Sequence, residues 1–91
     1  MDVKWTKRGL ESLDNIATYI ALGNPRAARD FVAAIQEKSA VLAQHPAIGR
    51  VGRLVANTRE MVVHKNYVMI YRVKADTVQI LRIHHVAQQA V

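Results

Sequence analysis

The chain has 91 residues, of which 51% are hydrophobic, and its formal net charge is +6 at pH 7. This length permits one modest hydrophobic core, so we expect a single domain over residues 1–91 and no separate substrate domain. The hydrophobic fraction is too high for a disordered chain, and the absence of cysteine excludes disulfides and thiolate chemistry.

The N-terminal residues, Met1 to Trp5, lack the apolar core of a signal peptide. No stretch of the sequence approaches the roughly 18 to 20 apolar residues of a membrane span. We therefore expect a cytoplasmic protein that has no membrane partner.

Positive charge is concentrated in the second half of the chain. Residues 50–91 contain seven Lys and Arg against only two acids, a net charge of +5. The first 49 residues contain six bases and five acids, a net charge of +1. This asymmetry indicates an acidic partner for the C-terminal part: nucleic acid, the ribosome or an acidic protein.

The first third of the sequence predicts a short strand and a helix. Val3 to Trp5 is a brief apolar run that we expect to join a sheet. Thr6 is a suitable N-cap, and the apolar spacing that follows predicts a helix from Lys7 to Ala21.

The tripeptide Gly23-Asn24-Pro25 predicts a tight link between two helices. Gly23 can close the first helix in the left-handed conformation, Asn24 can cap the second, and Pro25 suits its first turn. The second helix is predicted from Pro25 to Gln44, because an apolar stripe continues to that point and His45-Pro46 ends it.

The remainder of the chain predicts a basic loop followed by a β-meander. Residues 46–58 carry Arg50 and Arg53 and show neither helical nor strand periodicity, so we expect a loop. Three runs rich in Val, Ile, Met and Tyr then follow, separated by short polar turns, and they predict three antiparallel strands. These runs are Arg59 to Val63, Tyr67 to Val73 and Val78 to Ile83.

The expected architecture is α+β, in the order β-α-α-β-β-β, with a helical hairpin packed on one face of a small, mainly antiparallel sheet. Alternation in the last strand groups its residues by face, and either face could be turned toward the helices. One face would carry Val78, Ile80, Arg82 and His84, and the other Leu81, Ile83 and His85.

Arg82 and His84 are the candidate catalytic pair. Together with Arg59 or Arg72, they could act on a phosphodiester, with arginine stabilising the developing charge and histidine serving as general acid or base. The simpler interpretation is that these side chains are solvated or bind a partner's carboxylates. The sequence favours this interpretation, because it indicates no carboxylate that would orient the histidine.

No metal or cofactor site is expected. Adjacent histidines on a strand point to opposite faces, and no carboxylate lies at ligand spacing from the four histidines. Gly49 to Gly52 also lacks the Lys-Ser/Thr pair of a phosphate-binding loop.

Several short motifs, in this order, resemble toxins of the ParE/RelE superfamily over nearly the whole chain, with the ParE branch the more similar. They are Trp5-Thr6, residues 13–21, Asn24-Pro25 with Ala27-Ala28, residues 45–50, Arg59-Glu60, residues 66–73 and residues 80–85. The resemblance implies a stable toxin that is encoded with a labile antitoxin, as in plasmid stabilisation modules. It also implies one of two targets: ParE-like members poison DNA gyrase, whereas RelE-like and YoeB-like members cleave mRNA on the ribosome.

Three departures from the ribonuclease pattern favour the gyrase-directed interpretation. Val68 stands where that pattern has an arginine, and His84-His85 matches a His-Tyr pair. The glutamate expected before the meander has no counterpart, since residues 46–59 contain no acid.

The sequence thus predicts a non-enzymatic toxin that inhibits gyrase and forms a hetero-oligomer with an antitoxin through an acidic, partly disordered segment. Two alternatives remain: a ribosome-dependent endoribonuclease that uses Arg82 and His84, and a non-toxic nucleic-acid-binding module. The residues expected to contact the target are Arg59, Arg72, Arg82, His84 and His85, with Arg50 and Arg53 in the basic loop.

Overall fold

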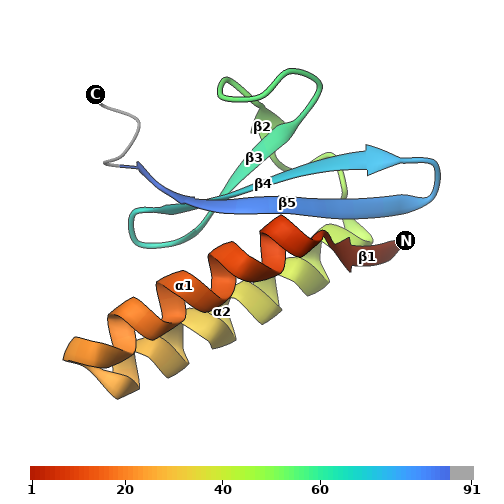
Figure 1. Ribbon diagram of the computed structural model, residues 1–91. Coiled ribbons are helices and arrows are strands. Elements are labelled where there is room, and N and C mark those ends of the chain that lie inside the picture. Colours follow the sequence, from red (N-terminus) through yellow and green to blue (C-terminus); the bar gives the residue numbers. More distant parts are fainter. Residues whose placement is uncertain (87–91) are drawn as a thin grey trace.

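Two helices cover one face of a five-stranded sheet in the computed structural model, which describes residues 1–86 (Figure 1). The last five residues of the predicted domain lie outside that range. The sheet order is β1-β5-β4-β3-β2, with β1 parallel to β5 and every other pair antiparallel. The elements are β1 (Asp2–Trp5), α1 (Lys7–Gly23), α2 (Pro25–Gln44), β2 (Arg50–Val51), β3 (Arg59–His64), β4 (Tyr67–Lys74) and β5 (Thr77–His85).

The predicted α+β architecture is confirmed, including the N-terminal strand and the three-stranded meander. One additional element corrects the prediction that residues 46–58 form only a basic loop. Arg50 and Val51 form the short strand β2, opposite Glu60 and Arg59 of β3. Within residues 1–86, no helix is both long and apolar enough to cross a lipid bilayer.

Local capping explains where α1 and α2 begin and end. Thr6 accepts a hydrogen bond from the Gly9 amide at the start of α1, and Asn24 accepts one from the Ala27 amide at the start of α2. The prediction of a left-handed Gly23 was wrong, since no glycine in residues 1–86 has a positive φ. Asn24 turns the chain instead, in an extended conformation (φ −160°, ψ 96°) that suits a residue preceding proline.

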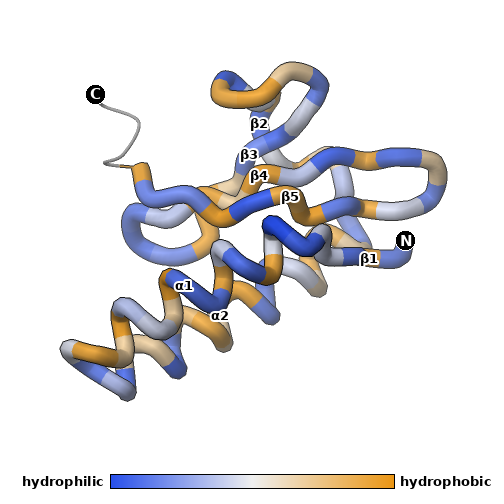
Figure 2. Tube along the Cα trace, in the orientation of Figure 1, coloured by the Kyte–Doolittle hydropathy of each residue, from blue (hydrophilic) through white to orange (hydrophobic). Residues whose placement is uncertain are grey.

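The core lies between the helices and the face of the sheet that we call the inner face. Hydrophobic and hydrophilic residues alternate along both helices, as expected where one side of each packs on a sheet (Figure 2). The buried cluster joins three residues of α2 to the inner face. Its members are Phe31, Ile35, Leu42, Val63, Met69, Tyr71, Val78, Ile80 and Ile83.

An irregularity in β5 corrects the predicted alternation of its faces. Ile70 of β4 lies opposite Arg82, whereas the next residue, Tyr71, lies opposite Ile80, so Leu81 is an extra residue that forms a β-bulge. The core therefore contains Val78 and Ile80 and also Ile83. Arg82 and His84 share one face, as predicted, but they do not share it with Val78 and Ile80.

Candidate functional site

The outer face of the sheet, turned away from the helices, carries Arg82 and His84. Pairing across the strands places Arg82 of β5 beside Ile70 of β4, then Glu60 of β3 and finally Arg50 of β2. Since neighbouring strands are about 4.8 Å apart, Arg82 and Glu60 lie about 10 Å from each other at the backbone. One buried acid is thus flanked by exposed arginines on both sides.

Glu60 is the outer-face residue whose role the sequence did not reveal. Its carboxylate accepts hydrogen bonds from the backbone amides of Arg53 (2.9 Å) and Leu54 (3.2 Å), and it pairs with the Arg50 guanidinium at 3.2 Å. Glu60 therefore anchors the basic loop on the outer face of the sheet. The loop lies on the side of the sheet opposite the helices (Figure 1). The available signal was that Glu60 is one of only two acids in residues 50–91 and that it lies within a predicted strand.

The pKa of Glu60 reflects two opposing effects. Burial acts to raise it, but the two amide hydrogen bonds and the pairing with Arg50 outweigh burial and hold it below 4.5. Glu60 is therefore ionised near neutral pH, and its charge stabilises the folded loop.

His84 has its imidazole nitrogens shielded from solvent. Neither nitrogen has a hydrogen-bond partner among residues 1–86. Burial, followed by the charges of Arg82 and His85, lowers the pKa of His84 below 6.5, and the charge of Glu60 opposes that shift. Glu60 is thus a nearby carboxylate that the sequence did not indicate, but its hydrogen bonds go to the loop and to Arg50.

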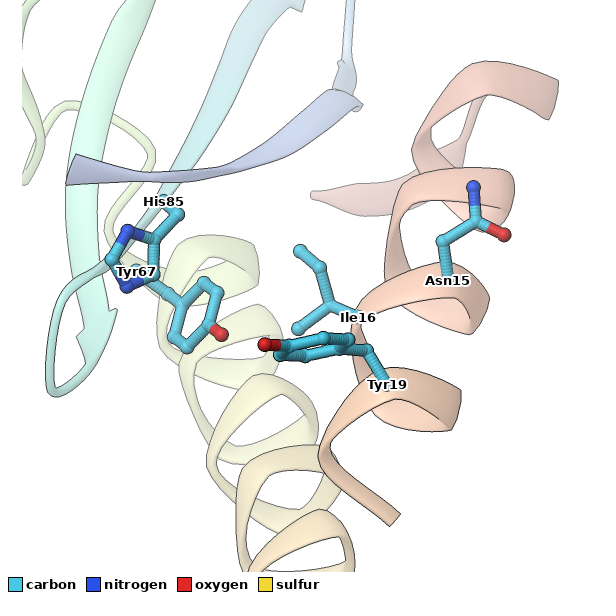
Figure 3. Close-up of a pocket in the computed structure, with 5 residues that line it drawn as sticks. All are labelled: Asn15, Ile16, Tyr19, Tyr67 and His85. Carbon is cyan, nitrogen blue, oxygen red and sulfur yellow. The ribbon is translucent and has the colours of Figure 1, made fainter. Parts of the chain in front are cut away.

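His85 lies on the inner face, apart from His84. Its ring packs edge-on against Tyr67, with 4.9 Å between ring centroids. Both side chains border an open hollow of about 400 Å³, where the hydroxyl ends of Tyr19 and Tyr67 point toward each other (Figure 3). The two adjacent histidines therefore belong to different surfaces.

The predicted arginines also divide between the two faces. Arg72 is exposed on the outer face, and its Nε donates to Gln79 Oε1 at 2.7 Å. Arg59 points toward the start of the loop, where it donates to the carbonyl oxygens of Ala47 and Gly49. Of the residues expected to contact a target, the outer face brings together Arg72, Arg82, His84 and Arg50, with Arg53 in the adjoining loop.

The described residues do not gather into a metal site. Within residues 1–86, no group of three or more His, Asp or Glu side chains is placed to hold an ion. What the outer face offers chemically is exposed positive charge beside a shielded, neutral imidazole.

Comparison with known proteins decides the family. The family model for the ParE toxin of the type II toxin-antitoxin system parDE matches residues 3–90. The chain belongs to the ParE toxin family. It is therefore a type II toxin of the ParE/RelE superfamily, as the sequence motifs suggested.

Individual relatives agree with that membership. The chain is 42% identical over 88 residues to the Sinorhizobium fredii protein Y4kP, covering 96% of this chain and 90% of that protein. It is 37% identical over 86 residues to toxin RelE2 of Caulobacter vibrioides, covering 94% and 96%. Among solved structures, a chain of the chromosomal ParDE system from P. aeruginosa matches with a TM-score of 0.83 and 30% identity, covering 94% of this chain and 96% of that one.

Proposed function

We propose that this ParE-family toxin acts on DNA gyrase by binding it, without catalysing a reaction. The proposed contact surface is the outer face with its loop, and its members are Arg50, Arg53, Arg72, Arg82 and His84. Exposed arginines are suited to an acidic protein surface, and charge complementarity there gives specificity and a fast association rate.

The state of the candidate catalytic pair carries this proposal. A general base needs an accessible nitrogen with a pKa near the working pH, whereas the nitrogens of His84 are shielded and its pKa is lowered. Val68, opposite His84, is fully buried and supplies no second cation. Among residues 1–86, the outer face thus offers exposed positive charge, whereas the His84 imidazole is not accessible for proton transfer.

The experiment is inhibition of gyrase supercoiling by the purified wild type and by two arginine variants. We expect Arg82→Ala to weaken inhibition by about five- to thirtyfold, since exposed interfacial charges contribute on the order of 1–2 kcal/mol to binding. Arg26→Ala is the matched control, because Arg26 is an exposed arginine on α2, away from the sheet. Equal inhibition by both variants would reject the outer face as the contact surface.

One observation favours an alternative, ribosome-dependent cleavage of mRNA. Arg82 and His84 do share a face, and the charge of Glu60 acts on His84 there. A conformational change that exposes the imidazole would give a cation and a titratable group side by side. Mapping mRNA ends after induction tests this alternative: codon-phased cuts that disappear in His84→Ala would replace the gyrase proposal.

The proposed partner is a cognate antitoxin with an acidic, partly disordered segment. A groove of about 420 Å³ between α1 and α2 is lined largely by apolar side chains, including Ala17, Ala21, Ala28 and Val32, and the outer face supplies positive charge. A segment that covers both would order on binding. Co-purification with the acidic product of a neighbouring gene would support this hetero-oligomer. We expect Arg72→Ala and Arg82→Ala to lose the partner at high salt, whereas Arg26→Ala should retain it.

A further inference from the structure

The β-bulge at Leu81 determines on which face of the sheet Arg82 and His84 stand. Strict alternation from Val78 and Ile80, which lie in the core, would turn Arg82 and His84 toward the helices as well. The extra residue reverses the pattern at one point, so that Ile83 fills the core and its two basic neighbours face outward.

Thr6, the N-cap of α1, supplies hydrogen bonds to this bulge. β1 pairs with β5 only as far as Trp5 opposite Ile80, and beyond that point α1 lies along β5 (Figure 1). The Thr6 amide donates to Ile80 O at 3.0 Å, and the Thr6 hydroxyl lies 3.1 Å from Ile80 O and 3.3 Å from Leu81 O. Thr6 therefore satisfies the carbonyl side of the bulge.

Ser12 satisfies the amide side. The Ile83 amide donates to Ser12 Oγ at 2.9 Å, across 71 residues of sequence, and Ser12 Oγ in turn donates to Gly9 O at 2.8 Å. Gly9 permits this close approach, because a Cβ on it would lie 2.5 Å from Ile80 O. Ser12 and Arg82 also border the same polar hollow, of about 310 Å³.

We propose that Ser12 is a positioning residue: by accepting the Ile83 amide it fixes the Leu81 bulge and so directs Arg82 and His84 outward, toward the target. The functional half of this proposal, that the outward side chains face the target, rests on the toxin's use of the outer face proposed above. The structural half, that Ser12 fixes the bulge, rests only on strand register and hydrogen bonds.

Hydrogen exchange on the full-chain protein tests the structural half. Ser12→Ala removes the acceptor of the Ile83 amide, so we expect this amide to exchange at least about tenfold faster relative to the Phe31 amide in α2. Ser39→Ala is the matched control, because Ser39 is a similarly half-buried helical serine whose hydroxyl donates to Ile35 O within α2. An unchanged ratio of Ile83 to Phe31 exchange in Ser12→Ala would overturn the proposal.

Growth arrest on induction tests the functional half without assuming a target. We expect Ser12→Ala to need about tenfold more toxin for the same arrest, Ser39→Ala to behave as wild type, and Ser12→Thr, which keeps the hydroxyl, to restore potency. Full potency of Ser12→Ala, despite faster Ile83 exchange, would reject the positioning role. If the wild-type protein arrests growth but leaves gyrase unaffected, the gyrase proposal fails. The potency of the Ser12 variants relative to wild type still tests the positioning role of Ser12.

Discussion

Arg50 and Glu60 form an ion pair at 3.2 Å in which the arginine side chain is 56% exposed and the glutamate side chain is 1% exposed. The pair is therefore not a surface salt bridge between two solvated groups. Glu60 lies under the loop, where it also accepts two backbone amides, while Arg50 remains available to a partner on the solvent side. A single buried charge thus organises the loop without removing the positive charge of the outer face.

Replacing this buried carboxylate should loosen the loop. Glu60→Gln keeps the shape of the side chain but removes the charge and one acceptor oxygen, so we expect the free energy of unfolding at pH 7 to fall by about 2 kcal/mol. Urea denaturation measures the loss, and Glu37→Gln, at an exposed position of α2, is the control. Equal stability of the two variants would contradict the anchoring role.

Acid should destabilise the protein through the same residue. The pKa of Glu60 is held below 4.5 in the folded state, so its stabilising effect is complete above that pH and is lost as the pH falls from 4.5 through the folded pKa. Unfolding measured between pH 6 and pH 3 should show a steep loss of stability in wild type. Glu60→Gln should show a shallower dependence of the free energy of unfolding on pH. Identical slopes in the two proteins would contradict the role of Glu60 in acid destabilisation.

His84 should produce a separate pH effect near neutrality. Its pKa is lowered, so the unfolded chain takes up a proton at higher pH than the folded one. The free energy of unfolding should therefore be greatest above pH 6.5, decline as the pH falls toward the folded pKa, and level off below it.

The variant His84→Phe isolates this effect. It keeps an aromatic ring and removes two nitrogens that have no hydrogen-bond partner within residues 1–86, so stability at pH 8 should not fall. The decline below pH 6.5 should be weaker than in wild type, whereas His45→Gln, at an exposed histidine, should leave it unchanged. A decline that persists in His84→Phe would show that another group titrates.

Tyr71 should stabilise the start of the loop through its hydroxyl. The phenol donates to Pro46 O at 2.8 Å and accepts the buried Gly49 amide at 2.9 Å. Tyr71→Phe leaves that amide without its acceptor, so we expect a loss of about 1–3 kcal/mol in the free energy of unfolding. Tyr19→Phe, at a tyrosine that is 75% exposed, should change it by less than about 0.5 kcal/mol; equal losses in a thermal melt would refute the assignment.

Local signals explain why so much of the fold could be predicted from the sequence. Thr6, Asn24-Pro25 and His45-Pro46 act through hydrogen bonds and steric limits within a few residues, so they placed both starts of the helices and the end of α2 correctly. The strands of the meander were recognisable because each alternates or remains apolar between short turns.

The candidate site depended on contacts that the sequence does not reveal. The Leu81 bulge is held by Thr6 and Ser12, which lie about 70 residues earlier in the chain. The local sequence indicates the bulge only through Arg82 and His84, two basic residues that strict alternation would place on the same face as Val78 and Ile80. Glu60 is buried because residues 50–54 of the preceding loop fold back onto it, a contact that the strand pattern does not indicate. Tertiary hydrogen bonds therefore set which face each candidate residue occupies.

The most direct measurement of the central claim is gyrase supercoiling of a relaxed plasmid in the presence of increasing amounts of the purified protein. We predict that supercoiling is inhibited and that cleaved DNA bound to gyrase accumulates, with both effects weakened by about five- to thirtyfold in Arg82→Ala. Undiminished supercoiling with no cleaved DNA, at concentrations of wild-type protein that arrest growth in cells, would contradict the claim.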